Sequence, residues 1–158
     1  MSLTLMPAVD VRDGKAVRMS KRTGEMVTFE ELIDEVGVDA TRYLMLSRSA
    51  DQPIDFDIEV AKKKDASNPV YYVQYAHARI CSVLKKLESE GVKFVGADAV
   101  DASVLTAPAE QALIRLLAAF PAEIAAAAEK YDPARITRYC IDVASAYHRF
   151  YNACRILD

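Results

Sequence analysis

The sequence predicts a mainly α-helical protein with a short β-hairpin near its N-terminus. After residue 68, apolar residues recur at steps of three and four along most of the chain, which is the period of an amphipathic helix. Asn68-Pro69 supplies a helix cap followed by a first-turn proline. Asp13-Gly14 stands between two alternating segments and is a strong hairpin signal, because both turn positions need a positive φ. Helices should therefore build most of the fold.

The N-terminal segment is expected to form the hairpin and then a short helix. Residues 8–19 alternate in the manner of strand, turn and strand. Thr28 and Glu31 form a capping-box pattern, and Gly37 is a suitable terminator. The sequence therefore predicts a helix over 29–36.

Further short elements lead to a predicted domain boundary near Ala66. Asp39 is expected to cap a second short helix. An extended segment follows, and then a short helix near 57–65 that contains a run of three lysines. These features divide the chain into a first region, 1–66, and a helical region, 67–158.

The first long helix is expected to run from its cap at Asn68 to a glycine stop at Gly91. An apolar stripe along one side of it should face a core, and its members are Val73, His77, Ile80, Leu84 and Leu87. Because His77 lies on this stripe, we expect it to be buried and hydrogen-bonded rather than catalytic or metal-binding.

Two more helical segments complete the prediction. An alanine-rich helix opens at Pro108, and Pro121 ends or restarts it. The last helix begins at Asp132-Pro133, and its apolar stripe comprises Ile136, Cys140, Val143, Tyr147, Phe150, Cys154 and Leu157. Since this stripe continues to the C-terminus without a glycine stop, we expect the chain to be a fragment, or a partner to cover the stripe.

The composition is that of a soluble globular protein. The 158 residues are 52% hydrophobic and 27% charged, with a formal net charge of −3. This charge argues against indiscriminate coating of nucleic acid but permits a local basic face. No run approaches the roughly 18 consecutive apolar residues of a membrane span, and no targeting segment is recognisable, so a cytoplasmic location is expected.

The cysteines and histidines do not suggest a disulfide framework or a metal site. The three cysteines are odd in number and lack a C-x-x-C spacing, and the chain has only two histidines. Cys140 and Cys154 fall on the last apolar stripe and are expected to be small core residues. No bound metal is predicted.

One face of the first long helix carries side chains suited to RNA. Tyr72, Tyr75, Arg79 and Lys86 lie away from the predicted core stripe. Tyrosine rings stack on unpaired bases and arginine holds phosphates. Alternatively, the tyrosines pack on a neighbouring helix and the cations are solvated. The pattern leaves both open, just as the lysine run is either a solvated face or a phosphate contact.

A basic, hydroxyl-bearing loop follows the hairpin. It carries Arg18, Ser20, Lys21 and Arg22, which suit the phosphate oxygens of a nucleotide or of nucleic acid. The loop lacks the G-x-x-x-x-G-K-[ST] pattern and is not a P-loop. The alternative is a basic exit from the hairpin that has no partner.

Three stretches resemble the arginyl branch of the class I aminoacyl-tRNA synthetases, of bacterial type. "RMSKR" resembles the family's K-M-S-K-S signature, "NPVYYVQYAHARI" the start of its anticodon-binding (DALR) domain, and "YHRFYNACRI" a later stretch of that domain. The resemblance implies a helical-bundle anticodon-binding domain preceded by the end of a class I α/β catalytic domain. Arg18 and Arg22 depart from the signature, where the family has its first lysine and its final serine.

The resemblance also implies roles for individual residues. Lys21 would be the catalytic lysine that stabilises the ATP phosphates during amino-acid activation. Arg18, Met19 and Ser20 would bind ATP together with Lys21. The tRNA contacts implied by the resemblance are Tyr72, Tyr75, Arg79, Tyr147 and Tyr151.

The expected function is that of one piece of an arginine–tRNA ligase, which uses ATP with Mg²⁺ and releases AMP and pyrophosphate. This piece would bind the anticodon loop of arginine tRNA as a monomer, without membrane contact or a bound cofactor. Its catalytic core would lie in cis outside the chain, so the piece alone should be inactive. The alternatives are a stand-alone helical RNA-binding module, a protein-interaction domain without catalysis, and a cysteinyl enzyme, which "VQYAHARI" argues against.

Overall fold

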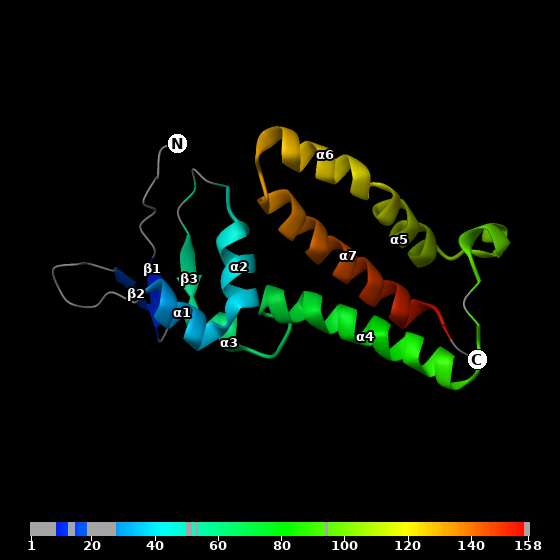
Figure 1. The fold of residues 1–158 in the computed structure, drawn as a ribbon, viewed down its shortest axis with the longest axis horizontal. Helices are drawn as coiled ribbons and strands as arrows, with labels where there is room; N and C mark the ends of the chain where they lie inside the picture. The colour runs from blue at the N-terminus through cyan, green and yellow to red at the C-terminus, as the bar shows by residue number, and fades with distance from the viewer. Residues whose placement is uncertain are drawn as a thin grey trace.

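A computed structural model describes residues 9–12, 15–18, 28–49, 52, 54–93 and 95–156 of the chain. A small sheet and three short helices occupy one end of the molecule, and four longer helices extend away from them (Figure 1). The short elements are β1 (Val9–Arg12), β2 (Lys15–Arg18), α1 (Phe29–Val36), α2 (Val38–Leu46), β3 (Asp55–Asp57) and α3 (Ile58–Lys62). The longer helices are α4 (Pro69–Ser89), α5 (Pro108–Ala118), α6 (Phe120–Lys130) and α7 (Ala134–Ala153). This arrangement confirms the predicted mainly helical fold.

The predicted hairpin is present in the sheet, whose strand order is β2-β1-β3. β1 and β2 pair antiparallel, with Val9 opposite Arg18. The extended segment adds β3 parallel to β1, with Val9 opposite Asp55. The turn residues Asp13-Gly14 lie outside the described residues. Leu32, Ile54, Phe56, Ile58 and Ala61 form a buried core beside the sheet.

The junction between α1 and α2 differs from the prediction in one respect. Thr28 and Glu31 form the expected capping box of α1. Asp39, however, lies in the first turn of α2, and Gly37 takes the capping position at φ 85. A positive φ is favourable for glycine, so one residue ends α1 and begins α2. The expectation that Asp39 is the cap is therefore wrong.

Asn68 starts α4 as predicted, and Val73 and Ile80 of the predicted stripe pack against a core, but other members of the stripe do not. Ala76 is buried and Tyr72 packs beside it, whereas His77 and Leu84 are exposed. The expectation of a buried His77 is wrong, because α7 packs against the side of α4 that includes Tyr72. The sequence shows several apolar residues around this helix and does not say which of them meet a neighbour.

α7 lies between α4 and the α5–α6 pair, and it contacts all three helices (Figure 1). Tyr139 of α7 donates a hydrogen bond from its hydroxyl to the Leu116 carbonyl of α5 at 3.0 Å, and its ring stacks on Phe120. Because α7 is covered on several sides, its buried residues extend beyond a single stripe: Ala134, Thr137, Tyr139, Ala144, Ala146 and Tyr147.

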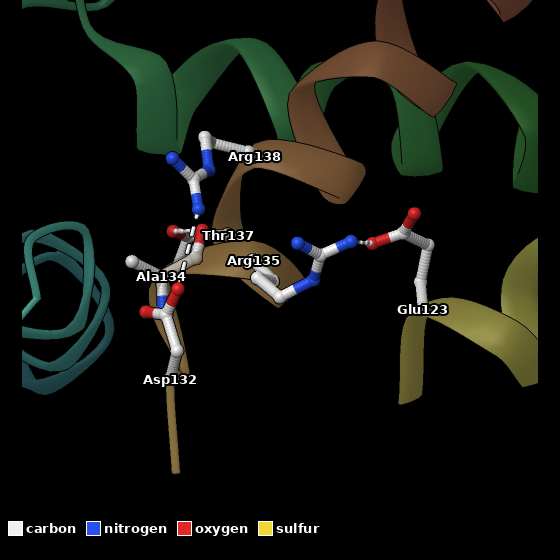
Figure 2. A network of polar contacts seen from close by, with 6 residues as sticks. All are labelled: Glu123, Asp132, Ala134, Arg135, Thr137 and Arg138. Carbon is white, nitrogen blue, oxygen red and sulfur yellow. Dashed lines mark hydrogen bonds and ion pairs between the residues drawn. The ribbon is translucent and has the colours of Figure 1, made fainter. Parts of the chain in front are cut away.

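The turn from α6 into α7 is held by polar contacts (Figure 2). Arg135 forms an ion pair with Glu123 of α6 at 2.7 Å. Asp132 accepts a hydrogen bond from the Ala134 amide at 3.1 Å, and its other oxygen lies 3.4 Å from Arg138. Asp132 therefore bonds to the first amide of α7 from just before the helix, whereas Pro133 takes the N-cap position.

Two helix ends bear on the remaining predictions. Pro121 restarts the alanine-rich helix, since α5 ends at Ala118 and α6 begins at Phe120. α7 ends at Ala153, with Cys154 in an extended conformation. The expectation that the last helix continues to the chain end is therefore wrong, and Leu157 lies outside the described residues.

Within the described part of the chain, one helical stretch, Pro108–Lys130, is long and apolar enough to cross a membrane by length and composition. Those two criteria alone are weak support for a membrane span. Arg115 and Glu123 interrupt the stretch, and Glu123 pairs with Arg135 of α7.

Candidate nucleic-acid interface

The candidate site forms where α4 and α7 approach each other. Ala76 of α4 and Ala144 of α7 are both buried in one cluster. Small side chains at a helix contact let the two backbones come close. This contact brings Tyr72, Tyr75 and Arg79 of α4 to the side of Tyr147 and Tyr151 of α7. The five predicted tRNA contacts, which come from two stretches of sequence, therefore share one region.

Arg79 is held between two tyrosine rings. Its guanidinium carbon lies 4.9 Å from the ring centre of Tyr75 and 4.4 Å from that of Tyr151. Its Nη2 donates a hydrogen bond to the Tyr75 hydroxyl at 3.0 Å, and its Nη1 lies 3.4 Å from His148 Nδ1. We call Tyr75, Arg79, His148 and Tyr151 the arginine clamp. Its cation–π and hydrogen-bond contacts fix the direction of the guanidinium.

The tyrosines around the clamp differ in exposure. Tyr75 is 43% exposed and Tyr151 is 37% exposed, and the ring of Tyr75 is also stacked on Tyr71, with ring centres 6.1 Å apart. Tyr147 is only 7% exposed, and its hydroxyl has no hydrogen-bond partner among the described residues. Burial raises the pKa of Tyr147. Tyr72 is half-buried and packs against the Ala76–Ala144–Tyr147 cluster. Tyr72 and Tyr147 therefore pack on the buried side of the arginine clamp.

His148 packs against the aromatic rings of Tyr72 and Tyr75. Its ring meets Tyr72 edge-on with centres 4.9 Å apart, and it lies 5.7 Å from Tyr75. Burial, and then the positive charge of Arg79, lower the pKa of His148, and the backbone of Tyr72 opposes this shift only in part. The neutral imidazole is therefore favoured at neutral pH.

A groove of about 640 Å³ opens beside the clamp. Its walls include Tyr75, Arg79, Lys86, Tyr151 and Arg155. Among the described residues that line the groove, none is acidic. A hollow that combines aromatic faces with cations suits an unpaired nucleobase and its phosphate.

The loop expected to contact ATP cannot be placed in the same way. Met19, Ser20 and Lys21 lie outside the described residues. Arg18 ends β2, and its backbone pairs with Val9. These four assignments remain predictions. The lysine run, which begins at Lys62 in the last position of α3, is exposed, and Lys62 forms an ion pair with Glu35.

His148 was not among the predicted site residues. In sequence it is one of several polar residues near the aromatic positions of α7, and its spacing does not mark it. The missing information was the pairing of α4 with α7, because Arg79 and His148 are 69 positions apart. Within the described residues, no group of three or more His, Cys, Asp or Glu side chains could hold a metal ion.

With this geometry established, comparison with known proteins identifies the family. A family model described as "DALR anticodon binding domain" matches residues 73–158, which is more than half of the chain. The chain belongs to the DALR anticodon-binding family. The matched part contains α5, α6, α7 and all of α4 except its first turn, so the arginine clamp lies on the DALR domain.

Two relatives that match nearly the whole of this DALR protein carry the same name. A protein named arginine–tRNA ligase from Caldanaerobacter subterraneus subsp. tengcongensis is 51% identical over 99% of the chain. Another of that name, from Desulforamulus reducens, is 49% identical, also over 99% of the chain. In both comparisons the chain spans 28% of the relative's length.

A solved structure shows the same fold. The arginyl-tRNA synthetase of Thermus thermophilus matches with a TM-score of 0.61 and 28% identity. The match covers 86% of this chain and 22% of the Thermus chain.

Proposed function

We propose that this DALR protein is part of an arginine–tRNA ligase, and that its arginine clamp and the adjoining groove bind the anticodon loop of arginine tRNA. The clamp carries the proposal. It holds a guanidinium between two half-exposed tyrosine rings, beside a groove with further cations. Unpaired bases of a tRNA loop would stack on such rings, and the cations would meet the phosphates between them.

Each predicted tRNA contact has a role in this proposal. Tyr75 and Tyr151 would offer ring faces to bases, and Arg79 would direct its remaining donors toward a base edge or a phosphate. Tyr72 and Tyr147 would act from the buried side of the clamp, by fixing the positions of the exposed rings.

The proposed ligase activity requires more than this surface. By resemblance, Arg18, Met19, Ser20 and Lys21 would contact the phosphates of ATP bound with Mg²⁺, and Lys21 would stabilise the charge that develops during arginine activation. The identity to two proteins named arginine–tRNA ligase extends over 99% of the chain and supports this part of the proposal.

The test of anticodon binding uses a stem-loop carrying an arginine anticodon and a second stem-loop whose middle cytosine is changed. Affinities of the chain for both RNAs would be measured across a salt series. Arg79→Ala is the informative variant. Arg115→Ala is its matched control, because Arg115 is exposed on α5, away from the clamp.

We expect Arg79→Ala to weaken binding of the cognate stem-loop by about 1–3 kcal/mol, because stacking and one charged contact are lost. Binding should weaken with salt, and the changed loop should bind less tightly. Arg115→Ala should bind normally. The proposal is wrong if Arg79→Ala and the unchanged chain bind the cognate loop equally, or if neither chain distinguishes the two loops.

A further inference from the structure

We propose that His148 is a positioning residue that aims Arg79 at RNA by offering an unprotonated Nδ1 to the guanidinium. This inference rests on the proposed function, since it takes the arginine clamp as the RNA-binding surface. It adds a residue that is not among the five predicted tRNA contacts, and it assigns a defined chemical state to that residue.

Only one position of the His148 ring proton is compatible with the contact from Arg79. A guanidinium only donates hydrogen bonds, so the contact from Arg79 Nη1 to His148 Nδ1, at 3.4 Å, requires a lone pair on Nδ1. The proton of the neutral ring must then be on Nε2. His148 therefore acts as an acceptor toward Arg79 in one tautomer only.

The surroundings of His148 favour this uncharged state. The groups facing its ring are Arg79, Tyr72 and Tyr75 from α4, with Tyr147 and Tyr151 close by on α7. No carboxylate is among these described neighbours, and the backbone of Tyr72, which favours an imidazolium, offsets burial and Arg79 only in part. A second positive charge beside Arg79 would instead repel the guanidinium.

The buried environment of Nε2 indicates that His148 is present for the acceptor at its Nδ1. His148 Nε2 is buried and has no hydrogen bond of good geometry from the described residues. An unpaired buried N–H is unfavourable, and a phenylalanine would fill the same space without it. A histidine at this position is therefore better explained by its acceptor toward Arg79 than by packing alone.

The three contacts of Arg79 fix its direction together. The ring of Tyr151 confines the guanidinium from one side, and the hydroxyl of Tyr75 accepts from Nη2. Without the Nδ1 acceptor, Nη1 loses its partner and the guanidinium can turn in the plane of the stack. Arg79 would stay between the rings but present its donors to RNA in several directions.

Three substitutions distinguish the contribution of the Nδ1 acceptor from that of the aromatic ring. His148→Asn places an amide oxygen near the position of Nδ1, His148→Gln places one near Nε2, and His148→Phe keeps the ring without an acceptor. Affinity for the cognate stem-loop would be measured for each variant. His77→Phe is the matched control, since His77 is the only other histidine and is exposed.

We expect His148→Phe and His148→Gln to weaken RNA binding about ten-fold, while His148→Asn stays within about three-fold of the unchanged chain. His77→Phe should bind normally. If His148→Phe binds as tightly as the unchanged chain, or if Asn and Gln weaken binding equally, His148 does not act through an acceptor at Nδ1.

A second measurement needs no substitution of His148. Nitrogen NMR of the ring should show the Nε2-protonated tautomer in the unchanged chain, and the Nδ1 resonance should move in Arg79→Ala. Finding the proton on Nδ1 would overturn the inference. If Arg79→Ala binds RNA normally, the proposed function fails instead, and the NMR result still decides whether His148 holds Arg79.

Discussion

Asn68 shows how one side chain can join two elements. Its Oδ1 accepts hydrogen bonds from the amides of Val70 and Tyr71 at the start of α4, at 3.0 and 3.4 Å. Its Nδ2 donates to the carbonyls of Ala61 and Lys63, at 2.8 and 2.9 Å. Asn68 is buried, and its contacts with Ala61 and Val70 are buried too, while those with Lys63 and Tyr71 are partly buried. The start of α4 is therefore fixed against the end of α3.

We expect Asn68→Asp to destabilise the fold by about 2–3 kcal/mol, although aspartate is a good helix cap. The substitution keeps an acceptor for the α4 amides. It also replaces the donor that faces two carbonyls with an oxygen that repels them. Urea unfolding would measure the loss.

Ala66→Asp is the control for the Asn68 prediction, because Ala66 is exposed two positions earlier. If Asn68→Asp is as stable as the unchanged chain, the contacts from Nδ2 do not contribute to folding.

At the residue scale, local signals were predictable and tertiary partners were not. The sequence predicted Asn68 as a cap because Asn followed by Pro is a local signal. It placed His77 in the core, whereas the structure shows His77 exposed, and it gave no indication that His148 contacts Arg79. A periodic pattern locates a helix, but the neighbouring helix decides which side is buried.

At the scale of elements, the contact between α4 and α7 depends on two alanines. Ala76 and Ala144 are 5% and 3% exposed, and Tyr147 fills the space beside them. A larger side chain at either position would have to push the two helices apart. Because Arg79 and His148 belong to different helices, such a shift would also open the arginine clamp.

We expect Ala144→Leu to cost about 1–3 kcal/mol of stability through overpacking. It should also change the NMR signals of His148, since the ring would move away from α4. Thermal unfolding and the histidine spectrum would report the two effects separately.

The matched control for Ala144→Leu is Ala153→Leu, because Ala153 is exposed at the end of the same helix. Equal stability of the two leucine variants would show that the α4–α7 contact is not tightly packed.

Helix starts were predicted better than the end of the last helix. Thr28 and Asn68 are capping residues, Asp132 bonds to the first amide of α7, and each acts through atoms close in sequence. The C-terminal end of α7 has no glycine signal, and the apolar pattern continued past it. The extended conformation of Cys154 ends the helix there, and nothing in the periodicity indicates it.

At the scale of the whole molecule, a tyrosine links the N-terminal elements to the long helices. The hydroxyl of Tyr43 in α2 donates a hydrogen bond to the Thr137 carbonyl of α7 at 2.8 Å. Burial, followed by the nearby Cys140 and Asp142, raises the pKa of Tyr43 to about 12. The hydroxyl therefore stays protonated well above the usual range of tyrosine.

We expect Tyr43→Phe to lower the free energy of unfolding by about 0.5–1.5 kcal/mol at neutral pH. The folded pKa of Tyr43 lies above its value of 10 in an unfolded chain, so its contribution is complete below pH 10. That contribution should be lost as the pH rises through about 12.

The difference between the unchanged chain and Tyr43→Phe, measured by urea unfolding from pH 8 to 12, tests both expectations for Tyr43. A difference that stays constant with pH would contradict the assigned pKa. No difference at any pH would show that the hydrogen bond does not stabilise the molecule.

The fold class, the hairpin and the long helices could be predicted because each has a signal within a few residues. The links between distant segments could not, since Tyr43 and Thr137 are 94 positions apart. The boundary at residue 66 stays a prediction, although β3 and α3 precede it and α4 follows it.

The separation of Arg79 and His148 along the chain has a consequence for the order of folding. The hairpin and α4 can form from local contacts as soon as their residues are available. The contact between Arg79 and His148 has to close a loop of 69 positions, and α5 and α6 lie within that loop. During synthesis, Arg79 therefore emerges long before its partner, and the proposed RNA-binding surface becomes complete only after α7 has been made.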